Sequence, residues 1–297
     1  MKRIIVLCLI SLFVLTVVGT GFAADRGYAN PQMLINAEQL KTKLDAGEEI
    51  RILDVTKKTS YMMSHIPGAT QVWGAELTNP DAGMGGIVAT KEGFEELMGK
   101  NGISNDSHVV VYDHSGGLWA TRVIWMMKLY GHHKVQLLDG GIDAWKDAGY
   151  DVNRLPDSVD EVTYEAKSYD QTIIISTEDV AKKLDNPNFV MIDTRSDAEY
   201  NGEKAFGGAP RKGHIPGAIH IEWNNALNED GTIKSASDLK ALYESHGVTP
   251  EKEIAMHCHS AVRSAHTWFA LRLIGYSNVK NYDPSWIGWS NSEQPIE

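Results

Sequence analysis

The residues from Glu253 to Ser264 read EIAMHCHSAVRS, and this segment gives the clearest indication of the fold. The short apolar run Ile254–Met256 is typical of a buried strand, and apolar residues at helical spacing follow in 264–274. Cys258 therefore lies in a short loop between a strand and a helix. Alternation of strands and helices favours a parallel sheet, and such sheets bind ligands at the carboxyl ends of their strands. We expect Cys258 to lie at that edge.

This strand-loop-helix unit is part of a longer pattern that occurs twice in the chain. The motif His-Ile-Pro-Gly-Ala begins at His65 and again at His214. Further ordered matches have offsets between 139 and 149 residues, and they pair Ile35 with Ile175, Ile52 with Met191, Asp113 with Cys258, and Trp145 with Trp289. Repeats in the same order with drifting offsets indicate a duplicated domain with loop insertions. A ten-residue insertion is expected between Asp193 and His214.

The repeat predicts an α/β fold with two tandem domains, each a parallel β-sheet flanked by helices on both faces. We place the first domain at residues 30–155 and the second at 168–297. The polar stretch from Asn153 to Lys167, which contains Pro156, reads as the linker. Asn36 and Ser176 occupy equivalent positions before helical patterns, where N-capping residues belong.

The N-terminal residues predict export. Lys2 and Arg3 precede a run of uncharged residues in 4–24, and small residues stand at Gly21 and Ala23. This is the pattern of a signal peptide at residues 1–23, cleaved after Ala23, so we expect a periplasmic or secreted protein. The alternative is an uncleaved membrane anchor, because the run is long enough to span a bilayer. No membrane contact is expected beyond this segment.

Composition narrows the class of partner and of metal site. The chain has 297 residues, two cysteines and a net charge of −11. The acidic balance argues against nucleic acid as a partner. One cysteine, Cys8, lies in the predicted signal peptide, which leaves Cys258 alone. A lone cysteine rules out a disulfide scaffold and a multi-cysteine metal site, and most often it is a small buried apolar residue.

The surroundings of Cys258 point to a nucleophile. Backbone amides of a curled loop, together with a helix N-terminus, form an anion cradle that lowers the pKa of a thiol. Arg263 adds a permanent cation at the rim. Cysteine-dependent phosphatases place five residues between cysteine and arginine, whereas this loop has four, which suits a single sulfur atom better than a phosphoryl group. His257 and His259 would face away from Cys258, so no metal site is expected.

At this point the chain resembles the two-domain rhodaneses, from about Asn36 to Trp289. The resemblance rests on both His-Ile-Pro-Gly-Ala segments, Asp-Thr-Arg at 193–195, Leu-Asp-Gly-Gly at 138–141, the cysteine loop and Tyr282–Trp289. It implies that Cys258 is catalytic and that the first domain, with Asp113 in its place, is non-catalytic. It also implies a set of substrate-binding residues: Arg263, Arg195, His259, Ser260, Ala261, Val262 and Ser264. The alternative for Arg195 is a structural ion pair with Asp193.

The resemblance implies a ping-pong reaction with no metal or organic cofactor. Cys258 would take the outer sulfur of thiosulfate as a persulfide and pass it to a thiophilic acceptor, cyanide or a thiol. Mercaptopyruvate-type members carry an arginine where this chain has Glu199, and a glutamate there would repel a carboxylate. Two alternatives stay open: a 3-mercaptopyruvate sulfurtransferase, and a non-enzymatic module that carries or binds sulfur. We expect a monomer. Ala261 departs from a usual glycine, which matters if the loop needs positive φ.

Overall fold

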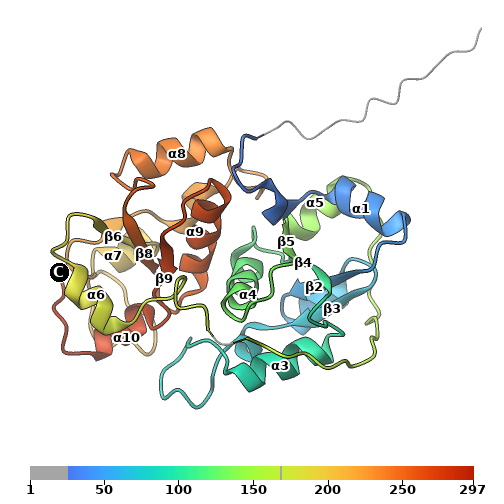
Figure 1. Cartoon of the computed structure of the whole chain (residues 1–297), viewed down its shortest axis with the longest axis horizontal. Helices are drawn as coiled ribbons and strands as arrows, with labels where there is room; N and C mark the ends of the chain where they lie inside the picture. Colours follow the sequence, from blue (N-terminus) through green and yellow to red (C-terminus); the bar gives the residue numbers. More distant parts are fainter. Residues whose placement is uncertain (1–25, 168) are drawn as a thin grey trace, which may run out of the picture.

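Two α/β units lie side by side in the computed structural model, which describes residues 26–167 and 169–297 (Figure 1). The predicted signal peptide at residues 1–23 lies outside the described residues. Within those two described ranges, no helix is long and apolar enough to cross a membrane.

The first unit is built on a five-stranded parallel sheet in the order β1-β5-β4-β2-β3. Its strands are β1 (Leu34–Ile35), β2 (Ile50–Val55), β3 (Ala69–Val72), β4 (His108–Tyr112) and β5 (Val135–Leu138). Its helices are α1 (Ala37–Asp45), α2 (Lys58–Met63), α3 (Lys91–Lys100), α4 (Leu118–Leu129) and α5 (Gly141–Asp147), with 3₁₀ turns at Pro31–Met33 and Gly74–Leu77.

The second unit repeats this topology with a parallel sheet in the order β7-β6-β8-β9. Its strands are β6 (Phe189–Asp193), β7 (Ile219–His220), β8 (Glu253–His257) and β9 (Val279–Asn281). Its helices are α6 (Thr177–Lys183), α7 (Asp197–Tyr200), α8 (Ala236–Glu244), α9 (Val262–Leu273) and α10 (Ser285–Asn291), with a 3₁₀ turn at Trp223–Ala226. Ile174 forms a parallel bridge to Asn281, at the position that β1 holds in the first sheet. The predicted duplicated fold is confirmed.

The central strand of each sheet divides its side chains between two cores. In β4, Val109 and Val111 join one apolar cluster, whereas Val110 and Tyr112 join another on the opposite face. This alternation follows from the two-residue period of a strand. Because both faces must be covered, β4 reads as an uninterrupted apolar run. Helices α1, α2 and α5 supply residues to one core of the first unit, and α3 and α4 supply residues to the other.

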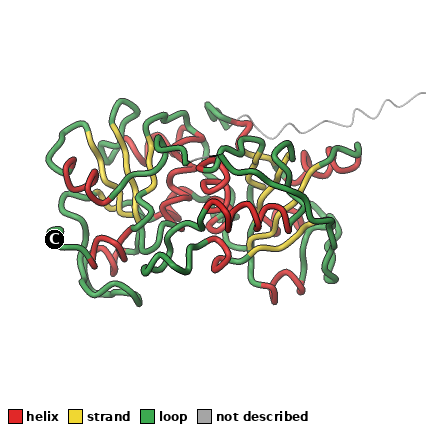
Figure 2. The backbone as a smooth tube through the Cα atoms, turned by 60° about the horizontal axis from the view of Figure 1, so that its bottom comes forward, coloured by secondary structure: helices red, strands yellow, loops and turns green. Residues whose placement is uncertain are grey.

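The two units share one core through α4 and α9. Nearly every residue of these helices is buried, as expected for helices enclosed on all sides. A single apolar cluster runs from Val109 and Phe94 in the first unit to Phe269 and Met256 in the second. Figure 2 shows helices gathered between the two sheets. The loops that precede α4 and α9 are thereby held at the domain interface.

Side-chain caps and the linker agree with the sequence pattern. Asn36 forms a capping box with Gln39, and the Ser176 side chain accepts the amide of Asp179. The linker runs over the first unit, where Asn153 pairs with His65 through backbone hydrogen bonds. Because these caps are local, the chain can specify both helix starts without tertiary contacts.

Candidate active site

Cys258 lies directly after β8 and just before α9, at the carboxyl edge of the second sheet. Its side chain is buried, and the residue is 1% exposed. Neighbouring β6 ends in register with β8, since Asp193 is paired with His257. The predicted placement of the thiol at the ligand-binding edge of a parallel sheet is confirmed.

The loop is held from outside by the start of α10. Ser285 Oγ accepts the amides of Cys258 (3.2 Å) and Ala261 (2.9 Å) and donates to the Tyr282 carbonyl (3.0 Å). The amides of Trp286 and Ile287 donate to the carbonyls of Cys258 and His259. These bonds draw two loop carbonyls towards α10.

The inner side of the loop stabilises a thiolate. Burial raises the pKa of the Cys258 thiol, but the Arg263 charge, the amides of Ser264 and Ser260 and the Ser264 hydroxyl together hold this pKa below its ordinary value. The Ser264 hydroxyl donates to Sγ at 3.8 Å. Charge and hydrogen bonds therefore outweigh desolvation at this sulfur. A lowered pKa raises the thiolate fraction of this sulfur at a given pH, and the thiolate is the nucleophilic form.

The first domain contains the same loop with its own anion in it. Asp113 follows β4 as Cys258 follows β8, and the residue is 1% exposed. Its carboxylate accepts four backbone amides of its loop: Ser115 (2.8 Å), Gly117 (2.9 Å), Trp119 (2.6 Å) and Ala120 (3.0 Å). Burial raises the pKa of Asp113, and these four amides oppose that shift. The repeated loop is therefore an anion cradle by construction.

Ala261 adopts the left-handed conformation, with φ of 57°. It is the N-cap residue of α9, and its counterpart before α4 is Gly117 with φ of 83°. A residue with a Cβ is strained in this region, where glycine is not. The positive φ that the sequence raised as a condition at Ala261 is present. Val262, which follows, is the first residue of α9.

Arg263 is paired as well as close to the sulfur. Its two terminal nitrogens donate to the Glu199 carboxylate at 2.6 and 2.9 Å. Glu199, which we expected to repel a substrate carboxylate, is 2% exposed and bound in this ion pair. The two residues are 64 positions apart, so their pairing carries no local sequence signal.

Arg195 is not part of the cradle. Its Nε and Nη2 donate to the Asp193 carboxylate at 2.9 and 2.6 Å, and Nη2 also donates to the Gly213 carbonyl. The guanidinium lies 4.4 Å from the centre of the Trp286 ring and is 1% exposed. Of the two roles that the sequence left open, the structure gives Arg195 that of a structural ion pair. Its charge is buried against Asp193, and the substrate-binding role of Arg195 stays a prediction.

His259 lies at the mouth of the loop, against the insertion of the second domain. Its Nε2 donates to the Gly207 carbonyl at 3.0 Å, and its ring meets the half-exposed Phe206 ring edge-on. Burial lowers the pKa of His259. Residues 203–210, which have no counterpart in the first domain, thus form one wall of the site.

The first domain forms another wall. Gly86, with φ of 87°, approaches Ser260 so closely that a Cβ at Gly86 would lie 2.4 Å from the Ser260 Cβ. Arg122 of α4 pairs with Asp283 at 2.8 Å and donates to the Gly86 carbonyl at 2.9 Å. Asp283 in turn accepts the amide of Val88 at 2.9 Å. The first domain is therefore clamped onto the loop that carries the thiol.

Comparison with known proteins identifies the repeated unit. The rhodanese-like domain model matches residues 36–148 and again residues 176–292. The chain belongs to the rhodanese family.

Relatives of the full tandem have names of two kinds. The sulfur carrier protein TtuD of Thermus thermophilus is 38% identical over 280 residues, which cover 89% of this chain and 96% of the relative. A thiosulfate sulfurtransferase of Corynebacterium glutamicum is 32% identical over 290 residues, covering 93% and 94%. By this relationship the chain is a rhodanese-family sulfurtransferase, and the names leave its donor and acceptor open.

Solved structures show the same tandem arrangement. An anaerobic ergothioneine biosynthesis enzyme from Chlorobium limicola, in complex with trimethyl histidine, aligns with a TM-score of 0.82 at 25% identity. The alignment covers 91% of this chain and 71% of that enzyme. The two rhodanese domains of this chain are thus arranged relative to each other as in the matching part of that enzyme.

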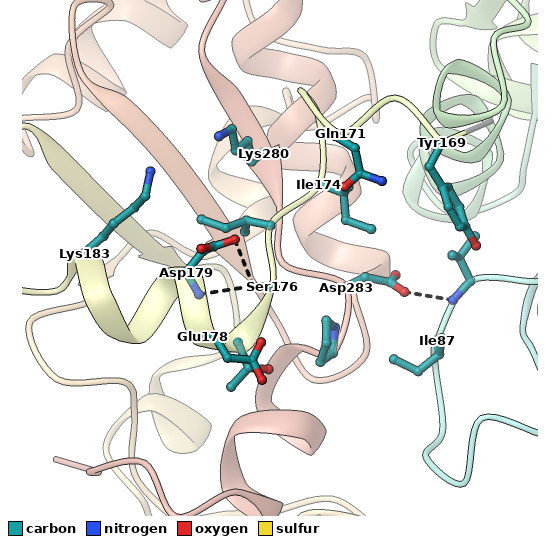
Figure 3. Close-up of a pocket in the computed structure, with 14 residues that line it drawn as sticks. Ile87, Tyr169, Gln171, Ile174, Ser176, Glu178, Asp179, Lys183, Lys280 and Asp283 are labelled. Carbon is teal, nitrogen blue, oxygen red and sulfur yellow. Dashed lines mark hydrogen bonds between the residues drawn. The ribbon is translucent and has the colours of Figure 1, made fainter. Parts of the chain in front are cut away.

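A cavity of about 610 Å³ lies where the linker meets both rhodanese domains (Figure 3). Tyr169 and Gln171, which follow the linker at the start of the second domain, border it, with Ile87 from the first domain and Asp283 further along the second. None of its described lining residues is a cysteine, and its Lys183 and Lys280 amino groups are paired with Glu253. We therefore place the chemistry at the Cys258 loop, which this cavity does not reach.

Proposed function

We propose that the protein transfers sulfane sulfur from thiosulfate to a thiophilic acceptor, cyanide or a thiol, through a persulfide on Cys258. The main support for this proposal is the buried sulfur of Cys258. The loop amides, the Ser264 hydroxyl and Arg263 hold the pKa of this thiol below its ordinary value. The cradle formed by the same loop around the Asp113 carboxylate supports this reading. Both loops favour a negative charge at one fixed point.

The first half-reaction loads the enzyme. The Cys258 thiolate attacks the outer sulfur of thiosulfate, a new S–S bond forms to Sγ, and the S–S bond of thiosulfate breaks with its electron pair leaving on sulfite. Two negative charges enter with thiosulfate and two leave with sulfite, so the persulfide keeps the single charge of the thiolate. The cradle serves both states because the anion stays inside the loop.

The second half-reaction removes the outer sulfur from the Cys258 persulfide. Cyanide or a thiolate attacks the outer sulfur of the persulfide, and the bond to Sγ breaks with its electron pair returning to Cys258. The product is thiocyanate or a new persulfide, and the thiolate returns to its resting state. Neither step needs a metal or an organic cofactor, because both steps only exchange bonds between sulfur atoms or between sulfur and the acceptor.

Two features favour thiosulfate over 3-mercaptopyruvate as donor. The loop reads Cys-His-Ser-Ala-Val-Arg, with Arg263 where mercaptopyruvate-type members have threonine. Glu199 stands where those members carry an arginine for the substrate carboxylate, so this position offers that carboxylate no cation. The name of the Thermus thermophilus relative favours a second candidate, a sulfur carrier that delivers the persulfide to a partner instead of turning over small acceptors.

Intact-mass analysis tests this proposal and separates the candidates. Thiosulfate should add one sulfur to Cys258, cyanide should remove it with turnover, and Cys258→Ala should do neither. Loading without cyanide turnover would support the carrier. No adduct from thiosulfate, or full activity in Cys258→Ala, would overturn the sulfurtransferase proposal. Faster turnover with 3-mercaptopyruvate than with thiosulfate would overturn the choice of donor.

A further inference from the structure

Glu199 and Cys258 compete for the same cation. Arg263 donates to both Glu199 carboxylate oxygens, and its charge is also the largest influence that lowers the pKa of the Cys258 thiol. Its side chain is 19% exposed and that of Glu199 is 2% exposed, so water screens the pair only weakly. The guanidinium therefore divides its charge between a carboxylate and the sulfur.

Glu199 is also fixed from behind. Ser196 is the N-cap of α7, and its backbone amide and hydroxyl donate to Glu199 Oε2 at 3.2 and 2.8 Å. Burial opposes ionisation of Glu199, but Arg263 and Ser196 together lower its pKa below the ordinary value. The carboxylate is therefore charged at neutral pH and cannot swing away from Arg263 without losing its cap.

The charges of the resting site sum to a negative value. The thiolate and Glu199 contribute one negative charge each, and Arg263 contributes the positive charge that they share. A donor with two negative charges must enter against this balance, and it can use Arg263 only by drawing the guanidinium from Glu199. A donor with one negative charge meets half of that repulsion.

We propose that Glu199 is a specificity-determining residue, which withholds part of the Arg263 charge from the donor and so, among donors of the thiosulfonate type, disfavours the doubly charged relative to the singly charged ones. This inference rests on the proposed sulfur transfer. It predicts that thiosulfate is a weaker donor than the cradle alone would allow. The charge of Glu199, and not only its position, sets the preference.

The test compares two donors in the loading half-reaction: thiosulfate, with two charges, and an organic thiosulfonate R–SO₂–S⁻, with one. Glu199→Gln keeps an oxygen for Arg263 and removes the charge. We expect the ratio of kcat/KM for thiosulfate to that for thiosulfonate to rise roughly three- to tenfold, mainly through the KM for thiosulfate. Asp197→Asn, on the same helix but 85% exposed, is the matched control and should leave this ratio unchanged.

A second variant covers the case in which Glu199→Gln does not fold. Ser196→Ala removes the hydroxyl that fixes Glu199 from behind, so the carboxylate is freer to release Arg263 and the ratio should rise, by less than in Glu199→Gln. If Cys258 is loaded in both variants but the ratio of the two kcat/KM values is unchanged, the specificity role of Glu199 is overturned. The proposed sulfur transfer then still stands. If neither donor loads Cys258 in the wild-type protein, the proposed function falls, and the specificity role falls with it.

Discussion

The carboxylate of Asp113 occupies in the first domain the place that the sulfur of Cys258 occupies in the second. Each follows the central strand of its sheet, and each accepts backbone amides from the loop that leads into the interface helix. A carboxylate fills the first loop, and the thiol that we propose as the nucleophile fills the second. One backbone arrangement thus surrounds a side-chain acceptor in both domains.

Asp113→Ala should destabilise the protein without removing its chemistry. Four amides lose a buried acceptor, so the free energy of unfolding should fall by about 2–4 kcal/mol. Urea denaturation measures this loss, and Asp45→Ala is the control, because the Asp45 side chain is 63% exposed. Sulfur loading on Cys258 should persist in the folded fraction. Equal stability of the two variants would contradict the cradle.

Gly86→Ala should slow sulfur loading from a distance in sequence. The new Cβ would lie 2.4 Å from the Ser260 Cβ, so the first domain must shift away from the catalytic loop. We expect the rate of loading to fall roughly tenfold or more, since small displacements of a reacting loop are costly. Gly83→Ala is a matched control, because Gly83 also has positive φ (69°) but nothing within 4 Å of an added Cβ. If both variants lose the same rate, backbone strain and not the contact is responsible.

Ser285→Ala should raise the pKa of the Cys258 thiol. Without the hydroxyl, the amides of Cys258 and Ala261 lose their acceptor and the loop is free to turn other groups outward. We expect this pKa to rise, and the pH dependence of alkylation of Cys258 measures the rise. Ser290→Ala, which removes a single hydrogen bond on the same helix, should leave this pH dependence unchanged. A shift of equal size in both variants would refute the positioning role of Ser285.

Buried histidines should make the fold sensitive to acid. Burial lowers the pKa of His266, on α9 at the domain interface, to about 4, and burial lowers that of His257 to about 4 as well. In the unfolded chain histidine titrates near 6.5, so the unfolded state binds more protons below that pH. Stability is therefore fully present above about pH 6.5 and is lost as the pH falls towards 4.

His266→Phe should flatten this acid limb. Both ring nitrogens of His266 lack a hydrogen-bond partner among the described residues, and its ring meets Trp223 edge-on. Denaturation curves at several pH values should show a loss between pH 6.5 and 4 that is smaller by on the order of 2–3 kcal/mol in the variant. His246→Phe, at an exposed position, is the control. An unchanged acid limb in His266→Phe would exclude His266 as its source.

Local sequence patterns were enough to predict the fold and the position of Cys258. The apolar run before Cys258, the caps at Asn36 and Ser176 and the repeated His-Ile-Pro-Gly-Ala motif predicted the strands, helices and duplication that the structure shows. The strand-to-helix transition also placed Cys258 at the ligand-binding edge. These signals depend on residues a few positions apart, and for that reason one sequence suffices to read them.

The partners of the charged residues did not follow from the sequence. Arg195 is next but one to Asp193, and only the structure shows that the two form a buried ion pair. Glu199 binds Arg263, 64 positions along the chain, and no local pattern predicts this pair. The sequence did single out the region of Ser285, which holds the Cys258 loop, because the segment Tyr282–Trp289 is part of the family resemblance.

The duplicated α/β fold and the thiol at the edge of the second sheet could be predicted from local patterns along the chain. The surroundings of that thiol could not: the Glu199 carboxylate that shares Arg263, the Ser285 hydroxyl that holds the loop, and Gly86 of the other domain against Ser260. The difference lies in the sequence separation of the interacting residues. Strands, helices and caps arise from neighbours along the chain, whereas the charge and shape of the site come from residues brought together when α4 and α9 pack into one core.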